Sequence, residues 1–363
     1  MKNKINIAVL FGGKSAEHEV SVQSAKNIIQ ALDKDRYNVT LVGIDKSGSW
    51  LKFNMSQLPS MKRVLLGEQK NTDKTILSCS DKGEFLVKGS EDNKKIDVVF
   101  PILHGPMGED GTIQGLLKIA NVPFVGAGVL GSAVGMDKDV MKRLLRDAGL
   151  PIAQFIVFRE YEKKEISFDK IKRKIGVPFF VKPANLGTSV GVSKVHNLSE
   201  FASAVAFAFS YDNKIIVEEY IKGREIECSV LGNEKPIASV CGEVIPKHEF
   251  YSYEAKYLDE SGASLSIPAR IGKNLEKKIK KLAIETFETL GCEGMARIDF
   301  FVSENEKVLI NEINTIPGFT SISMYPKLWE ASGISYSRLI DTLVDLAIKR
   351  FDKEKKLKTS FSK

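Results

Sequence analysis

The sequence has few cysteines, and those it has show no metal-binding or disulfide pattern. The four cysteines of the 363-residue chain are Cys79, Cys228, Cys241 and Cys292. Because they lie far apart and form no closely spaced pair, they argue against a zinc site or a disulfide framework and are typical of a reducing compartment. We expect them to fill the core.

Long apolar runs are also lacking. A transmembrane helix needs roughly 20 consecutive apolar residues, and no stretch of the chain approaches that length. The apolar run before Gly12 is short and has no small-residue cleavage site, so it predicts a first strand rather than a secretion signal. The sequence thus predicts a cytoplasmic protein with no membrane partner.

The formal charge of +7 gives little support for nucleic-acid binding. Residues 349–363 contain seven Lys or Arg and two acids, a net charge of +5, which leaves +2 for the rest of the chain. Only Phe351 and Phe361 lie among these basic residues, so aromatics for base stacking are scarce. We predict no nucleic-acid partner and expect the tail to be a solvated, frayed end.

The first part of the chain alternates apolar runs with helical patterns. The predicted elements are strands at 5–11, 37–44 and 96–103 and helices at 21–32 and 113–120. This order is typical of an open α/β sheet, whereas residues 52–95 show no clear pattern. At about 150 residues per domain, the length predicts two or three domains.

Two loops of this part are candidate ligand sites. Ligands of open α/β sheets bind where a strand gives way to a loop, which is the position of His104 after the 96–103 run. The loop SAEHEVS follows Gly12 and Gly13 and carries Glu17. The G-x-G-x-x-G spacing is absent, so we expect a substrate loop there. The alternatives are a plain loop histidine and solvated loop acids.

The middle of the chain predicts a small α/β domain at 151–212, after a helix at 138–148 whose charged face we expect to be solvated. Its loop VKPANLGTSVGV places Lys182 at a strand end before several glycines and hydroxyls. Such a loop suits phosphate, with backbone N–H groups over the oxygens and a lysine beneath. It is not a P-loop. Another apolar run, 215–220, carries Glu218 and Glu219, which are either site acids or an exposed edge.

The remaining part contains a long aperiodic segment and two strong helical patterns. Residues 242–268 are aromatic and polar, and loops of this length are often functional lids. Amphipathic helices are predicted at 275–290 and 336–350.

Between those helices, two strand-like runs carry polar residues at alternate positions. Side chains alternate across a strand, so Arg297 and Asp299 share one face, and Glu312 and Asn314 repeat the pattern on the next run. Two carboxylates and an amide oxygen, with no His or Cys nearby, are the hard ligands that Mg²⁺ takes beside nucleotide phosphates. The alternative is a hairpin whose polar face is only solvated.

Several motifs in fixed order resemble the ATP-grasp superfamily and, more narrowly, the D-alanine:D-alanine ligase family. They are SAEHEVS, HGPMGEDGT, MDK at Lys138, KPANLGTSVG, EEYIKGRE, YEAKY, GMARIDF and NEINTIPGFTSISMYP. Each alone is a weak match, but the ordered set spans about 5–348 and is specific. The resemblance favours the metal interpretation of the hairpin.

The resemblance implies an α/β ATP-grasp fold of three domains. These would be an amino-terminal substrate domain at 1–126, a central domain at 127–217 and a carboxy-terminal domain at 218–363, with nucleotide between the last two. It also implies a homodimer that joins two D-alanines with ATP, through an acyl phosphate, for peptidoglycan precursors.

The resemblance assigns roles residue by residue. Two Mg²⁺ or Mn²⁺ ions would be held by Asp299, Glu312 and Asn314. Positive charge around the phosphates would come from Lys138, Lys182 and Lys256. The tetrahedral oxyanion would be stabilised by Arg297 and the backbone N–H of Gly318. The nucleoside would be bound by Phe180, Glu218, Tyr220, Ile221, Glu225 and Phe301.

On the substrate side, Glu17 would bind the first ammonium group, near His104. Ser189 and Tyr257 would form a polar link that closes a lid and excludes water. Ser323 would bind the carboxylate of the second D-alanine.

Three alternatives remain open from the sequence. Family relatives that make D-alanyl-D-lactate lack the tyrosine that is Tyr257 here. Relatives with altered second substrates often carry Arg where this chain has Met324, which suits a methyl group, and Gly242 offers no acid for a serine hydroxyl. D-alanine is favoured on both counts. The motif NTIPGFTS is, however, shared with the resistance-type ligases, so a D-alanine:D-serine ligase remains an alternative. Another ATP-grasp ligase, or a basic nucleic-acid binder on an inactive fold, would be further alternatives.

Overall fold

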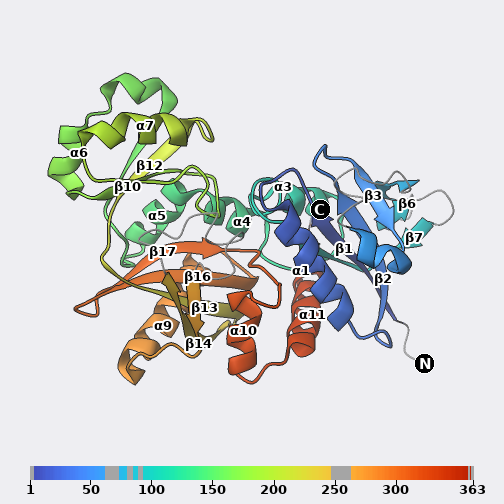
Figure 1. Cartoon of the computed structure of the whole chain (residues 1–363). Helices are drawn as coiled ribbons and strands as arrows, with labels where there is room; N and C mark the ends of the chain where they lie inside the picture. Colours follow the sequence, from blue (N-terminus) through green and yellow to red (C-terminus); the bar gives the residue numbers. More distant parts are fainter. Residues whose placement is uncertain are drawn as a thin grey trace.

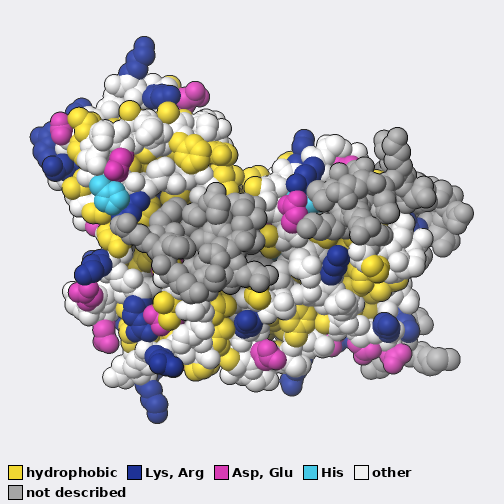
Figure 2. Space-filling view, in the orientation of Figure 1, with side chains coloured by type: hydrophobic (Ala, Val, Ile, Leu, Met, Phe, Trp, Pro, Cys, Tyr) yellow, Lys and Arg dark blue, Asp and Glu magenta, His cyan; other side chains and the backbone are white. Residues whose placement is uncertain are grey.

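Three larger β-sheets organise the computed structural model of the chain (Figure 1). The structure describes residues 4–61, 73–79, 85–88, 93–246, 263–358 and 360. Lys256 and Tyr257, two predicted site residues, lie outside these ranges. Figure 2 shows acidic and basic side chains intermixed over the described part of the face in view.

The amino-terminal sheet has the strand order β4-β3-β2-β1-β8. Its parallel strands are β1 (Ile5–Gly12), β2 (Tyr37–Ile44) and β8 (Val98–Ile102), with antiparallel β3 (Trp50–Phe53) and β4 (Asp73–Lys74) at one edge. Its helices are α1 (His18–Ala31) and α3 (Thr112–Ile119). The strands and helices predicted for this part are confirmed within a few residues.

The segment without a clear sequence pattern contains short elements. They are the helix η1 (Met55–Ser60) and a three-stranded sheet of β5 (Ile76–Cys79), β6 (Phe85–Lys88) and β7 (Asn93–Lys95). Strands of two to four residues give too few alternations to be recognised from sequence.

The carboxy-terminal helix α11 (Tyr336–Glu354) packs on the amino-terminal sheet, beside α1 (Figure 1). Its apolar face, including Leu339 and Leu343, shares a core with Ile7 and Phe100. Because the helix continues to Glu354, the expectation of a frayed tail from residue 349 is wrong for residues 349–354. Arg350 of this helix is 8% exposed, and its guanidinium donates hydrogen bonds to the backbone carbonyls of Phe124 and Gly126.

The central sheet is antiparallel, in the order β11-β10-β12-β9. Its strands are β9 (Phe155–Arg159), β10 (Phe179–Pro183), β11 (Ser193–Val195) and β12 (Lys214–Glu219), and its helices are η2 (Glu160–Glu165), α6 (Phe168–Ile175) and α7 (Leu198–Phe209). The rings of Phe168, Phe179 and Phe201 pack together in its core. The expected domain boundary at 217/218 falls inside β12.

The carboxy-terminal sheet has the order β15-β14-β13-β16-β17. Its strands are β13 (Gly223–Gly232), β14 (Ile237–Pro246), β15 (Ala263–Ser266), β16 (Gly294–Ser303) and β17 (Val308–Asn314). The associated helices are α4 (Val129–Met136), α5 (Lys138–Asp147), α9 (Lys273–Thr289) and α10 (Met324–Ala331). The segment 242–268 was predicted to be one long loop, but it begins in β14 and ends with β15.

Three cysteines, Cys228, Cys241 and Cys292, are free and buried in the core, as predicted. No helix in the described ranges combines the length and the apolar character needed to span a bilayer.

Candidate active site

The hairpin of β16 and β17 brings the predicted polar residues to one face. Arg297 is paired in register with Asn314, and Asp299 with Glu312, while Ile298 and Phe300 are buried on the other face. A bulge between Asp299 and Phe300 shifts the register beyond this point, so only the first part of the hairpin presents the polar row. The predicted alternation is confirmed.

Arg297 is the centre of this polar face. Its guanidinium donates two hydrogen bonds of 2.7 Å to the two oxygens of Asp299 and lies 2.8 Å from Glu227 Oε2. Asn314 Nδ2 also donates to Asp299, at 3.0 Å. Burial alone would lower the pKa of Arg297, but Asp299 and Glu227 outweigh it and raise that pKa well above its ordinary value.

Glu227 was not predicted. It lies on β13, in register with Asp299, so three neighbouring strands present Glu227, Asp299 and Glu312 in one row. The available signal was the alternation of Glu225, Glu227 and Ser229 along 223–232. That signal was missed because this segment was not recognised as a strand.

The oxygen donors suit a hard divalent cation, but the structure shows them engaged with cations of the protein. Lys138 Nζ lies 3.3 Å from Glu312 Oε2, and Arg297 holds Asp299. Within the described ranges, no three His, Cys, Asp or Glu side chains are arranged to hold a metal ion. A metal at Asp299, Glu312 and Asn314 would therefore have to replace these protein cations.

Helix α5 contributes a buried charge cluster next to this row. Glu218 on β12 forms ion pairs with Lys142 of α5 and Lys182 of β10, and Lys142 Nζ also donates to Asn311 O at 3.2 Å. One turn earlier, Lys138 Nζ donates to Leu186 O at 2.7 Å. The charged face of α5 was expected to be solvated, which is wrong here, because carboxylates of two sheets surround these lysines.

Burial would raise the pKa of Glu218, which is 2% exposed, but Lys142 and Lys182 lower it below its ordinary value. Glu218 is therefore a buried, ionised carboxylate rather than an exposed edge. Its neighbour Glu219 accepts a hydrogen bond of 2.7 Å from the backbone N–H of Gln154.

The residues expected to bind the nucleoside lie on two sheets. Phe180 is in register with Glu218 in the central sheet, and Phe301 is in register with Glu225 in the carboxy-terminal sheet. Tyr220 and Ile221 lie in the connection between these sheets. The Phe180 and Tyr220 rings are 6.1 Å apart, and Lys194 Nζ lies 3.9 Å from the Tyr220 ring centroid.

Glu17 lies where loops of the first two sheets meet. A methyl group added at Gly105 would lie 3.0 Å from Glu17 Oε2, and one at Gly187 would lie 3.6 Å from it. Gly187 belongs to the predicted phosphate loop, in which Thr188 and Ser189 have positive φ angles. The structure thus places Glu17 next to that loop.

His104 is buried and uses both ring nitrogens on the protein. Nδ1 lies 3.0 Å from Ile316 O and Nε2 lies 3.4 Å from Ser24 Oγ. Burial lowers the pKa of His104, so the neutral ring donates from Nδ1 to the carbonyl and accepts at Nε2. Ser24 Oγ in turn accepts from the N–H of Phe319, so His104 and Ser24 hold the segment that contains Gly318.

Glu109 is a further unpredicted residue, from the HGPMGEDGT motif. It accepts hydrogen bonds from the backbone N–H groups of Gly105, at 2.7 Å, and Ile316, at 3.2 Å. Burial and the nearby Glu17 raise the pKa of Glu109 to about 8. Glu109 therefore ties the amino-terminal loop to the same segment that His104 contacts.

Ser323 and Gly318 are adjacent, since a methyl group at Gly318 would lie 2.7 Å from Ser323 Oγ. Ser323 Oγ accepts from the N–H of Thr320 at 3.0 Å. Met324 is 5% exposed and packs against Gly242, where a methyl group would lie 2.8 Å from its sulfur. Gly242 and Met324, the two positions that bear on the choice of the second substrate, are therefore in contact.

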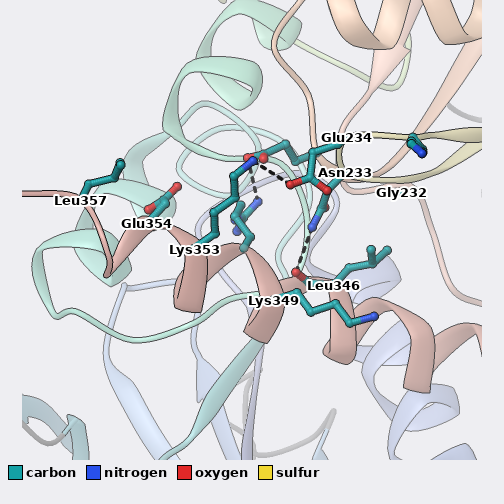
Figure 3. A pocket seen from close by; sticks show the side chains of 11 residues that line it. Gly232, Asn233, Glu234, Leu346, Lys349, Lys353, Glu354 and Leu357 are labelled. Atoms are coloured by element: carbon teal, nitrogen blue, oxygen red, sulfur yellow. Dashed lines mark hydrogen bonds and ion pairs between the residues drawn. The ribbon is translucent and has the colours of Figure 1, made fainter.

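A separate groove of about 480 Å³ lies between α11 and the β13–β14 turn (Figure 3). Asn233 Nδ2 donates to Leu346 O across it, and Lys353 pairs with Glu234. Its lining includes none of the predicted site residues.

Comparisons with known proteins identify the family of the chain. Residues 6–127 match the family described as "D-ala D-ala ligase N-terminus", and residues 144–345 match "D-ala D-ala ligase C-terminus". The chain is 52% identical to the D-alanine–D-alanine ligase of Shouchella clausii, over 98% of both chains. It is 49% identical to D-alanine–D-alanine ligase A of Escherichia coli K12, covering 98% of this chain and 99% of the relative.

Solved structures show the same likeness. The D-alanine-D-alanine ligase of Coxiella burnetii superposes with a TM-score of 0.88 at 40% identity, covering 97% of this chain and 96% of the other. The VanG D-Ala:D-Ser ligase of Enterococcus faecalis gives 0.84 at 34% identity, covering 95% and 100%. The fold is the ATP-grasp fold, and the family is ATP-dependent. The chain belongs to the D-alanine–D-alanine ligase family.

Proposed function

We propose that the protein joins two D-alanines with ATP to give D-alanyl-D-alanine for peptidoglycan precursors. The observation that carries this proposal is the row of Arg297, Asp299, Glu312 and Asn314, in contact with Lys138 of the MDK motif. Family membership over nearly the whole chain supports the same activity.

A carboxylate is a poor electrophile, so its oxygen first attacks the γ-phosphate of ATP, and the bond to ADP breaks. The amine of the second D-alanine then attacks the acyl-phosphate carbonyl, loses a proton, and inorganic phosphate leaves. Two Mg²⁺ or Mn²⁺ ions, when bound, would offset the phosphate charge. We propose that Asp299, Glu312 and Asn314 hold them, while Lys138, Lys182 and Lys256 contact phosphate oxygens.

Arg297 and the N–H of Gly318 are proposed to stabilise the tetrahedral oxyanion, which commonly contributes about 3 kcal/mol per donor. His104 acts by positioning the Gly318 segment, since both of its ring nitrogens already contact protein atoms. Glu17 would bind the first ammonium group and Ser323 the second carboxylate. Ser189 and Tyr257 would link the lid, and Met324 would lie near the second methyl group.

The nucleoside is proposed to lie between Phe180 and Phe301, with its base at Glu218, Tyr220 and Ile221 and its ribose at Glu225. This position joins the central and carboxy-terminal sheets. We propose domains of 1–126, 127–219 and 220–363, because β12 belongs wholly to the central sheet. Helices α4 and α5 lie in the second range but pack on the core of the carboxy-terminal sheet.

Phosphate release tests the activity, with D-alanine, D-serine or D-lactate offered as the second substrate. We expect release with D-alanine and only weak release with the others. Glu312→Ala should abolish it, because the metal row loses its ligand, and Glu304→Ala is the matched control, since Glu304 forms an exposed pair with Lys222. Full turnover by Glu312→Ala would contradict the proposed site. Addition of a chelator should stop turnover, and Mg²⁺ or Mn²⁺ should restore it.

We further propose that the protein works in the cytoplasm, where ATP is available, as a homodimer. Ile119 of α3 and Leu130 of α4 are large apolar side chains that are 87% and 68% exposed, which supports association through apolar contacts. Light scattering coupled to gel filtration gives the oligomeric state, and a monomer at micromolar concentration would contradict this part.

A further inference from the structure

Lys142 is the most deeply buried lysine among the described residues, and the proposed reaction assigns it no role. Its side chain is 0% exposed, although lysine is almost never fully buried unless it is paired. Its partner is Glu218, which is itself 2% exposed. A charge pair removed this completely from water is costly to bury, so it calls for a reason beyond stability.

Glu218 has two lysine partners, and one of them has a second anionic group within its proposed reach. Lys182 stands at the end of β10, beside the loop proposed to hold phosphate, so it has an alternative anionic partner there. Lys142 Nζ is enclosed by Glu218 and the Asn311 carbonyl on β17. When Lys182 contacts phosphate, Lys142 remains as the partner that stays on Glu218. Burial lowers the pKa of Lys142, and so does Lys182, but Glu218 opposes this change, and the departure of Lys182 removes one of the two causes.

The charge of Glu218 determines which purine it accepts. An ionised carboxylate only accepts hydrogen bonds, whereas a protonated one also donates. Adenine presents an amino group at position 6, which donates, and a 6-oxopurine presents a carbonyl oxygen there, which accepts. A carboxylate therefore pairs with adenine and repels a 6-oxopurine.

We infer that Lys142 is a specificity-determining residue, which acts through Glu218 by holding it as a carboxylate that accepts a 6-amino and rejects a 6-oxo purine. The inference rests on the proposed function, in which Glu218 meets the base. Lys142 is a positioning residue, since it contacts the nucleotide only through Glu218.

The charged groups around the pair set the direction of the pH effect. Glu218 faces Lys142 and Lys182, and Lys142 faces Glu218, Lys182 and Glu312. Both lysines lower the pKa of Glu218 against the effect of burial, so replacing Lys142 by an uncharged residue raises that pKa. Glu218 then takes up a proton as the pH falls and gains a donor for a 6-oxo group.

The test compares kcat/KM for ATP and for inosine triphosphate, which has a 6-oxo group, in wild type and Lys142→Met. We expect the ATP/ITP ratio to fall about tenfold or more in the variant. The ratio should recover as the pH is raised and Glu218 ionises. Any contribution of the Ile221 backbone to recognition of the base is the same in all variants, so it cancels when their ATP/ITP ratios are compared. Arg143→Met, on the exposed face of α5, should keep the wild-type ratio.

A double-mutant comparison separates this role from simple support of the fold. Glu218→Gln, which can donate as well as accept, should lower the ratio, and adding Lys142→Met should change it no further, because Lys142 acts through Glu218. This comparison also serves if Lys142→Met alone does not fold, since the double variant removes both charges. Equal losses for ATP and ITP in Lys142→Met, or a further change in the double variant, would overturn the inference.

The two proposals fail differently. Absence of D-alanine-dependent phosphate release by wild type would contradict the ligase activity, and selectivity would then be measured as the ratio of ATP and ITP dissociation constants by calorimetry. Wild type that releases phosphate with D-alanine but uses ATP and ITP equally would contradict only the role of Lys142.

Discussion

Replacing Arg350 with alanine tests how the carboxy-terminal helix is fastened to the amino-terminal sheet. Arg350 donates hydrogen bonds of 2.6 Å to Gly126 O and 2.8 Å to Phe124 O, and its guanidinium lies 4.6 Å from the Phe124 ring centroid. Glu293 lies 3.6 Å away. The substitution removes all of these contacts, which join the third proposed domain to the end of the first.

The expected magnitude follows from these contacts. Hydrogen bonds from a charged donor contribute roughly 1.5–3 kcal/mol each, and the contact with the ring adds about 0.5–2 kcal/mol. Burial opposes them, since it lowers the pKa of Arg350 despite the nearby Glu293 and Glu354. We expect a net loss of about 3 kcal/mol in the free energy of unfolding, similar to the cost of breaking other buried charge contacts.

Thermal unfolding measures this loss. For a protein of this length, with about 2.1 cal/mol/K of unfolding entropy per residue, Arg350→Ala should lower the melting temperature by roughly 4 °C. Lys353→Ala is the matched control, because Lys353 lies one turn later on α11 and forms only an exposed pair with Glu234. It should melt close to wild type, since exposed ion pairs contribute little. Equal melting temperatures for both variants would refute the proposed fastening.

Two further predictions follow from buried contacts. Because burial and Glu17 raise the pKa of Glu109 to about 8 from about 4.5, the folded state holds a proton that the unfolded chain releases, and stability should decline as the pH rises through this range. Glu109→Gln should flatten that decline in melting curves, and an unchanged profile would contradict it. Gly242→Ala should cost about 1–3 kcal/mol in urea titrations, because the methyl group meets Met324 Sδ at 2.8 Å. Met324→Ala in the same chain should recover part of this cost, and strict additivity would contradict the contact.

The sequence predicted the elements whose pattern is local. Arg297 and Asp299 alternate with buried residues along one strand, so the polar face of the hairpin followed from the period of two, and the register confirms it. Helices α6 and α7 lie within the small α/β domain predicted at 151–212, and a local polar residue, Ser167 or Asn197, caps the start of each.

Other features depend on partners that are distant in the chain. Lys142 looked like a solvated helix residue, and only Glu218, on a strand of another sheet, explains its burial. Glu227 gained its meaning from the register of β13 with β16. A pattern within one segment does not contain this information, because tertiary contacts decide whether a charged side chain is solvated or paired.

These contacts also bear on how ATP and metal would bind together. Among the described residues, each cation proposed to meet phosphate or the oxyanion already has a carboxylate partner: Lys182 has Glu218, Lys138 has Glu312, and Arg297 has Asp299. Nucleotide affinity is therefore the difference between the new phosphate contacts and the protein contacts that they replace. When Lys182 moves, Lys142 stays on Glu218. When Lys138 or Arg297 moves, its partly buried carboxylate partner loses a cation, which is unfavourable. A divalent ion at Asp299 and Glu312 would restore that balance, so each ligand should strengthen the binding of the other.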